Sequence, residues 1–172
     1  MLYTRPAAVL SPAFISTNSL TKSYGLASLR CGWAIASRET TERIRRARDV
    51  MDVWGPIPAD RLSVLAFGRL NRLAARTRTL LEVNSRLASE FLESRPDLEC
   101  IPSRATIAFP RMKGQSDAHD FVERLSERYR TAVAPGAFFG SPAHFRISFG
   151  GATDQLRRGL AAIAHCLDSP RD

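Results

Sequence analysis

The segment Trp54-Gly55-Pro56-Ile57-Pro58 constrains the fold of this 172-residue chain more than any other stretch. Each proline fixes its own φ angle and lacks a backbone N–H donor, so a regular helix or strand cannot continue through the segment. Short apolar runs and one helical pattern precede it, and a long helical pattern follows it. We therefore predict a domain boundary here, with residues 1–52 in one part and residues 53–172 in another.

Apolar residues recur at helical spacing in four stretches. The first helix is predicted from an N-cap at Ser37 to about Asp52, and the second pattern, from Ala59 to Ser94, is divided or bent at Gly68. The third stretch is "DAHDFVERLSERYR", and the fourth is capped by Thr153 or Asp154.

Short apolar runs between these helices predict strands. "CGWAIAS" is typical of a buried strand, "LECIPS" and "ATIAFP" are predicted as two short strands, and "TAVAPG" and "HFRISFG" are predicted as two further strands. Helices that alternate with short strands indicate an α/β fold in which helices pack on a small sheet.

Charge and cysteine content narrow the class of protein. The formal net charge is +8, but arginines alternate with acids in "ERIRRARD" and "FVERLSERYR", a pattern that favours solvated helix faces over a nucleic-acid site. Cys31, Cys100 and Cys166 are odd in number and widely spaced, which argues against a disulfide framework or a metal site and favours a reducing cytoplasm. No run approaches the roughly 20 apolar residues of a membrane-spanning helix.

The chain has two lysines among many arginines, and one of them lies in "STNSLTKSYGLASLRCGW", where a loop between two strands is predicted around the lysine. Ser19 and Lys22 formally match the S-x-x-K motif of penicillin-binding proteins and β-lactamases. That motif needs a later K-T-G, whereas the other lysine, Lys113, lies in "MKGQ". This alternative is therefore remote.

The same stretch resembles the pyridoxal-phosphate attachment site of class I and II aminotransferases. Ser19, Lys22, Gly25, Arg30 and Gly32 match that site in register. A lysine amine can lose its proton and attack an aldehyde, which an arginine cannot do. Arginine and serine side chains suit the phosphate of the cofactor, and glycines let the backbone turn tightly.

The C-terminal stretch "VAPGAFFGSPAHFRISFGG" resembles the later part of the same enzymes, where a P-G-x-x-F-G turn leads to a strand that carries F-R-I. In the family, the arginine of that strand binds the α-carboxylate of the substrate. The resemblance assigns this role to Arg146. Taken alone, Arg146 is more typical of a solvated strand face or an ion pair.

The resemblance implies a fold-type I enzyme that transfers an amino group between an amino acid and a 2-oxo acid, with pyridoxal phosphate as cofactor. Lys22 is then the catalytic residue, Ser19, Lys22 and Arg30 bind the cofactor, and Arg146 binds the substrate. The chain is similar to the end of the large domain, residues 1–52, followed by the complete small domain, residues 53–172. A homodimer is implied, and Trp54 would lie near the partner.

An alternative is a catalytically silent fragment, or half of a split enzyme that needs an N-terminal partner chain. In the family, an acid that pairs with the pyridine nitrogen of the cofactor precedes the lysine. No Asp or Glu precedes Glu39 in this sequence. We therefore expect the isolated chain to be inactive, and we expect apolar surface to be exposed around residues 1–36.

Overall fold

The computed structural model describes residues 5–51, 55–102 and 105–169. The chain forms two compact units, residues 1–77 and residues 78–172, and the helix α4 (Leu70–Glu93) runs through their division. The predicted boundary between residues 52 and 53 lies beside a segment outside the described residues and stays a prediction. Trp54, the predicted partner contact, also lies outside the described residues.

Two helices of the first unit, and the start of α4, form largely as predicted. The helix α2 (Arg38–Met51) follows Ser37, whose Oγ accepts a hydrogen bond from the Thr40 N–H at 3.2 Å, so the predicted cap is confirmed. The helix α3 (Ile57–Phe67) carries Pro58 in its first turn, where a missing N–H costs no helical hydrogen bond. Gly68 and Arg69 separate α3 from α4, which confirms the predicted division.

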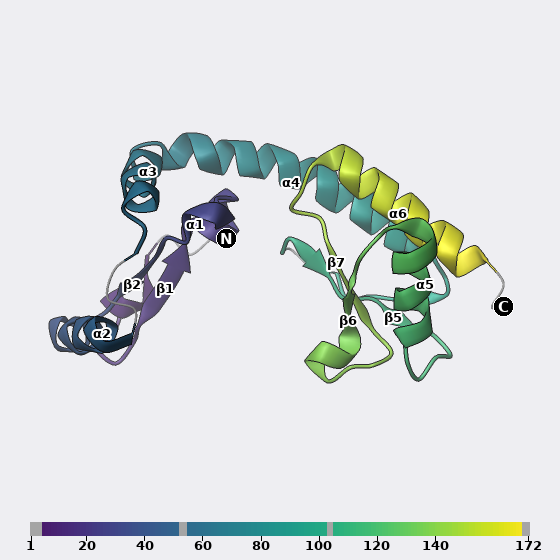
Figure 1. Cartoon of the computed structure of the whole chain (residues 1–172), viewed down its shortest axis with the longest axis horizontal. Helices are drawn as coiled ribbons and strands as arrows, with labels where there is room; N and C mark the ends of the chain where they lie inside the picture. Colours follow the sequence, from purple (N-terminus) through teal and green to yellow (C-terminus); the bar gives the residue numbers. More distant parts are fainter. Residues whose placement is uncertain (1–4, 52–54, 103–104, 170–172) are drawn as a thin grey trace. The chain divides into compact units, whose positions relative to one another are not determined.

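An antiparallel ribbon holds the lysine segment (Figure 1). The strand β1 (Ser16–Ser19) pairs with β2 (Gly32–Ile35) in a register that places Ser16 opposite Ile35 and Ser19 opposite Gly32. The prediction of a buried strand is wrong for β2, because only Trp33 among its four residues is even half-buried. Trp33 meets the edge of the Phe67 ring at a centroid distance of 5.4 Å, and no other element of the described first unit covers the strand enough to bury it.

The described first unit exposes much of its apolar surface. Leu20 is its single fully buried large apolar side chain, at 0% exposure. The prediction of exposed apolar surface around residues 1–36 is confirmed by five side chains that are at least two-fifths exposed: Val9, Leu10, Phe14, Ile15 and Ile35. A 3-10 turn over Ala7–Val9 buries none of its residues. Backbone hydrogen bonds between β1 and β2 therefore stabilise this unit more than a buried apolar core does.

The second unit contains the sheet predicted near the end of the chain. The strand β7 (Phe145–Ser148) is central, with β4 (Ile107–Ala108) on one side and β6 (Ala134–Pro135) on the other, all antiparallel. The strand β3 (Leu98–Glu99) pairs with β5 (Arg111–Met112) instead. The two short strands predicted in "LECIPS" and "ATIAFP" are confirmed as β3 and β4, and each of them pairs with another strand of the second unit.

Two amphipathic helices, α5 (His119–Tyr129) and α6 (Thr153–Asp168), pack against this sheet and against each other (Figure 1). Their apolar faces match the predicted stripes. The α/β class is confirmed in this coarse form. The buried core of the unit consists of Ala88, Leu98, Ala108, Met112, Ala118, Phe121, Leu125, Phe145, Ile147, Phe149, Leu156, Leu160, Ile163 and Cys166.

A buried amide joins α4 to the start of α6. The Asn84 side chain is completely buried; its Nδ2 donates to the carbonyl oxygens of Phe149 and Gly151, each at 2.8 Å, and its Oδ1 accepts from the Thr153 hydroxyl at 2.8 Å. The predicted cap by Thr153 or Asp154 is wrong: Ala152 is the N-cap residue and offers no side-chain bond. The Thr153 hydroxyl binds Asn84 instead of the helix backbone.

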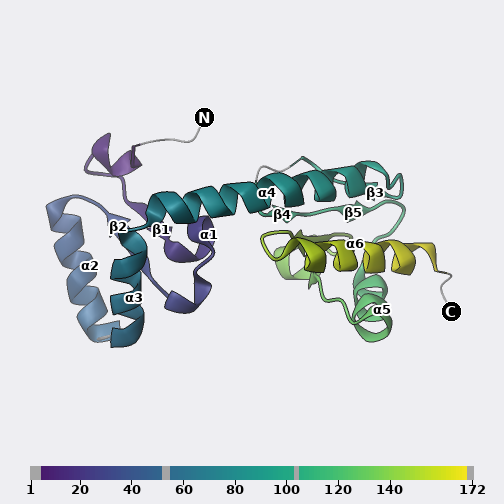
Figure 2. The same ribbon diagram turned by 90° about the horizontal axis from the view of Figure 1, so that it is seen from above.

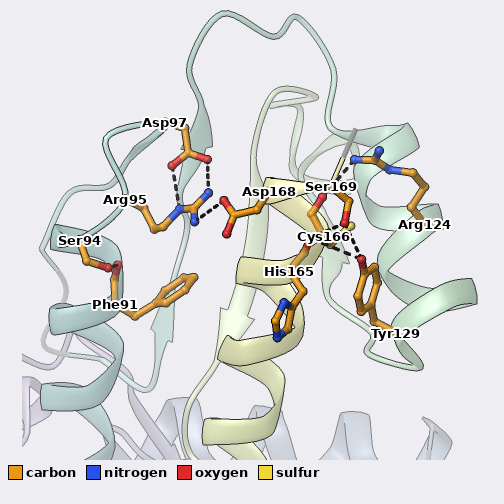
Figure 3. Close-up of polar contacts among 10 residues, drawn as sticks. All are labelled: Phe91, Ser94, Arg95, Asp97, Arg124, Tyr129, His165, Cys166, Asp168 and Ser169. Carbon is orange, nitrogen blue, oxygen red and sulfur yellow. Dashed lines mark hydrogen bonds and ion pairs between the residues drawn. The ribbon is translucent and has the colours of Figure 1, made fainter. Parts of the chain in front are cut away.

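A guanidinium holds the other end of α6. Figure 3 shows Arg95 between two carboxylates, with hydrogen bonds of 2.9 and 2.8 Å to Asp97 and an ion pair of 2.7 Å to Asp168. The Tyr129 hydroxyl lies 2.8 Å from the Ser169 hydroxyl just beyond α6. In the second unit, α6 and the adjoining part of α4 run in the same direction in both views (Figure 1 and Figure 2). The first residue of α6, Thr153, binds Asn84, and its last residue, Asp168, binds Arg95 just after α4.

Among the described residues, no helix is both long enough and apolar enough to span a membrane.

We expect Asn84→Ala to lower the free energy of unfolding of the second unit by about 2–4 kcal/mol. The substitution leaves two carbonyl groups and the Thr153 hydroxyl without the hydrogen bonds that Asn84 makes to them. The matched control is Asn71→Ala in the same helix, where the side chain is exposed. Urea unfolding followed through amide signals of residues 78–169 measures both changes. Equal effects of the two substitutions would contradict the assigned role of Asn84.

The Arg95 cluster predicts a pH dependence. The hydrogen bond from Arg95 lowers the pKa of the Asp97 carboxyl. A carboxylate with a depressed folded pKa contributes stability that is complete above its unfolded pKa of about 3.9 and is lost as the pH falls through the folded pKa. Because the Asp97 side chain is 41% exposed, solvent screening limits this contribution to about 1 kcal/mol.

We therefore expect Asp97→Asn to destabilise the second unit more at about pH 6 than at about pH 3, because the contribution of a carboxylate with a lowered folded pKa declines once the pH falls below the unfolded pKa of about 3.9. Arg95→Gln must remove the same acid-dependent difference, since it removes the cause of the low pKa. Unfolding by urea at the two pH values provides the comparison. A cost of Asp97→Asn that is the same at both pH values would show that the ion pair is not responsible.

Candidate functional site

The lysine predicted to attach the cofactor lies on a short helix between β1 and β2. The helix α1 (Leu20–Tyr24) follows β1 directly and ends at Gly25, which has a left-handed φ of 69°. Its first residue, Leu20, is fully buried and donates its N–H to the Cys31 carbonyl at 3.0 Å. Lys22, two residues further along this anchored helix, is exposed. The segment predicted as a loop is therefore helical around the lysine.

Ser19 and Arg30 lie at the two ends of the same segment. Ser19 is the last residue of β1, half-buried and opposite Gly32. Arg30 follows a 3-10 turn, η2 (Ala27–Leu29), and has a left-handed φ of 48°, a conformation that disfavours side chains with a Cβ by about 1–2 kcal/mol. This backbone conformation orients the exposed Arg30 side chain.

The local geometry brings the three predicted residues onto one continuous segment but does not join their side chains. Among the described residues, no hydrogen bond or ion pair links the side chains of Ser19, Lys22 and Arg30 to one another. A Cβ on Gly32 would lie 3.2 Å from the Asn18 carbonyl oxygen, so glycine suits the close approach of the two strands. The three groups remain available to a ligand with an aldehyde and a phosphate.

Sequence reasoning missed Asn18. Its Oδ1 accepts a hydrogen bond from the Ser19 N–H at 2.7 Å and lies 3.5 Å from the Ser23 hydroxyl. The side chain thus connects the end of β1 to α1. An asparagine directly before the S-x-x-K register was the available signal, since asparagine commonly binds nearby backbone groups.

Arg146 lies on the central strand of the second unit. Its neighbours Phe145 and Ile147 are buried in the core, so the alternation of a strand places Arg146, which is half-buried, on the opposite face. The guanidinium carbon lies 4.8 Å from the centroid of the Phe139 ring. Arg146 belongs to one unit and the lysine segment to the other, and the structure defines each by itself.

Residues 4–163 match the family described as aminotransferase class I and II. The chain belongs to this family. The predicted family is confirmed. The match covers both the lysine segment and the strand of Arg146.

Two curated relatives and one solved structure are also similar to this chain. The chain is 32% identical over 152 residues to capreomycidine synthase of Streptomyces vinaceus, covering 87% of this chain and 39% of the relative. It is 30% identical over 164 residues to aspartate aminotransferase of Thermococcus kodakarensis, covering 95% and 43%. A PLP-dependent aminotransferase from Streptococcus suis has the same fold, with a TM-score of 0.87 and 24% identity over 95% of this chain and 46% of that one.

Pyridoxal phosphate, the predicted cofactor, is confirmed as the cofactor of this aminotransferase family. The chain spans about two-fifths of the length of the curated relatives that it matches. The roles of individual residues, and the assignment of residues 1–52 and 53–172 to the large and small domains, stay predictions.

Other candidate groups of this aminotransferase chain do not form a second centre. Within the part that the structure describes, no group of three or more His, Cys, Asp or Glu side chains is placed to hold a metal ion. Burial raises the pKa of the Cys166 thiol, which favours the unreactive protonated form. Cys166 is thus a core residue, and Cys31 is half-buried beside the lysine segment.

The P-G-x-x-F-G turn of this aminotransferase chain is closed by contacts that allow only glycine at its second position. A Cβ on Gly136 would lie 2.2 Å from the Ser141 carbonyl oxygen and 2.3 Å from that of His144. The Gly136 N–H donates to the His144 carbonyl at 2.8 Å, so the turn connects β6 directly to the start of β7. The crowding fixes the backbone two residues before Arg146.

We expect Gly136→Ala to destabilise the second unit by about 1–3 kcal/mol, because the backbone must move to accept the methyl group. Gly150→Ala is the matched control: its Cβ would meet Thr106 at an ordinary 3.5 Å. Urea unfolding of both variants, with the amide shifts of residues 144–148, tests the difference. A Gly136→Ala variant as stable as wild type, with unchanged β7 shifts, would contradict this account.

Proposed function

We propose that this chain contributes the cofactor-attachment and carboxylate-binding residues of a pyridoxal-phosphate-dependent aminotransferase, which transfers an amino group between an amino acid and a 2-oxo acid. One observation supports the proposal: Ser19, Lys22 and Arg30, whose spacing resembles the attachment site of the family, lie on one segment that is held by the buried Leu20 and exposes Lys22. The cofactor, when bound, supplies an electron sink for the substrate.

The residues of the chain have distinct proposed roles. The Lys22 Nζ would hold the cofactor covalently, and the lysine amine would move the proton at the α-carbon of the substrate. The Arg30 guanidinium and the Ser19 hydroxyl donate hydrogen bonds to the phosphate. Arg146 binds the α-carboxylate through its paired N–H groups. The first three roles suit the first unit because its amine, guanidinium and hydroxyl lie within one segment.

The setting of the enzyme is part of the proposal. Amino acids and 2-oxo acids are the proposed substrates, and a homodimer in the cytoplasm is the proposed form. The three cysteines are free in the structure, as is usual for a protein of a reducing compartment. Exposed apolar side chains of the first unit offer surface for a partner subunit.

A second candidate is a catalytically silent fragment, or half of a split enzyme that needs an N-terminal partner chain. One observation motivates this candidate: the chain spans about two-fifths of the length of its curated relatives. Under this candidate, the isolated chain shows weak cofactor binding and no turnover. Turnover of an amino acid with 2-oxoglutarate, lost in Lys22→Ala, would exclude the silent fragment.

The two lysines of the chain allow an internal comparison. Mixing the chain with pyridoxal phosphate, trapping the adduct with borohydride and digesting with a protease that cleaves beside arginine gives separate peptides for Lys22 and Lys113. We expect labelling at Lys22 to exceed that at Lys113 by about tenfold, because phosphate contacts worth about 1.4 kcal/mol are available only beside Lys22.

Lys22→Arg must abolish the strong labelling, and Lys113→Arg, at another exposed lysine, must leave it unchanged. Arg30→Gln and Ser19→Ala should each reduce the preference for Lys22. Equal labelling of the two lysines in the wild-type chain would refute the proposed cofactor site, since an exposed amine reacts with aldehydes without any site.

A further inference from the structure

The Arg146 guanidinium is held by an aromatic ring and not by an acid. Its central carbon lies 4.8 Å from the centroid of the Phe139 ring, within the range of a cation–π interaction. None of the ion pairs in the described part of the chain includes Arg146. The charge of this residue therefore stays uncompensated while its position is restricted.

The Phe139 ring is itself fixed by two further rings. It meets Phe109 edge to face, at a centroid distance of 5.7 Å and an interplanar angle of 87°. Phe109 stacks on His144 at 4.8 Å and 18°. The three rings of Phe139, Phe109 and His144 therefore contact one another in sequence, and His144 precedes Arg146 by only two residues. The crowded turn at Gly136 fixes the backbone that carries Phe139.

Stacking and carboxylate binding use different parts of a guanidinium. An aromatic ring contacts the flat face of the group, whereas the five N–H donors point outward in its plane. A carboxylate partner would occupy those donors and compete with a substrate. A ring leaves them free and removes much of the rotational freedom that a flexible arginine otherwise loses on binding.

We propose that Phe139 is a positioning residue for Arg146, which it holds ready to bind the carboxylate of a ligand in a bidentate manner. This inference rests on the carboxylate-binding role proposed above for Arg146. Phe139 is 47% exposed, so its function here is separable from core packing. Its neighbour Phe138 is 78% exposed and has no ring contact with Arg146 in the structure, which makes it a matched control.

The test uses the full chain and maleate, an unreactive dicarboxylate, as the probe. Two-dimensional NMR of arginine Nε–H groups follows the Arg146 signal, which is assigned by its loss in Arg146→Lys. In Phe139→Leu we expect the ligand-free Arg146 signal to shift as the ring current is lost, and the affinity for maleate to fall about two- to fivefold. Phe138→Leu should change neither quantity.

Two further variants protect the comparison. Phe139→Met, of similar volume but without an aromatic face, must reproduce Phe139→Leu, and Phe139→Tyr must restore the signal and most of the affinity. Backbone amide shifts of β6 and β7 report whether each variant keeps the fold.

The two proposals fail in different ways. Unchanged Arg146 signals and affinities in both Phe139→Leu and Phe139→Met would overturn the positioning role. A wild-type Arg146 signal that does not respond to maleate would instead overturn the carboxylate role of Arg146, and with it this inference. The wild-type titration alone therefore separates the two failures.

Discussion

The second unit depends on the buried carboxamide of Asn84. This side chain satisfies the Phe149 and Gly151 carbonyl groups and the Thr153 hydroxyl, and so it joins α4 to the residues between β7 and α6. A buried amide that loses a partner leaves polar groups without water or protein contacts, which costs more than an unmade surface bond. The end of the strand that carries Arg146 is therefore fixed by a residue more than sixty positions earlier.

The two units are stabilised in different ways. In the second, polar contacts at both ends of α6 enclose a continuous apolar core, so side-chain packing and hydrogen bonding support each other. In the described first unit, Leu20 is the single large apolar residue that is fully buried, and local hydrogen bonds carry the geometry of the lysine segment. Such a segment can keep its shape over a few residues, but its exposed apolar side chains favour further protein contacts.

Local patterns predicted what local physics determines. The cap at Ser37, the break at Gly68 and the apolar stripes of α5 and α6 all follow from spacing within a few residues. The pairing of β3 with β5 and of β4 with β7 could not be predicted, because strands of two residues carry almost no register information. The prediction of Thr153 as a cap was wrong because its hydroxyl binds Asn84, a partner that is distant in sequence.

The candidate site shows the same division. Ser19, Lys22 and Arg30 could be proposed from the sequence because their register is local, and their roles stay predictions. The P-G-x-x-F-G pattern places Phe139 in a turn but does not indicate that its ring contacts Arg146, which only the structure reveals. The difference matters in a chain with so many arginines. Arg95 is nearly buried and bonded to two carboxylates, so its charge stabilises the fold. Arg146 is held by a ring that leaves its N–H groups free, so its charge is available to an anion. The partner of each guanidinium, more than its burial, therefore indicates whether its charge is already paired within the fold.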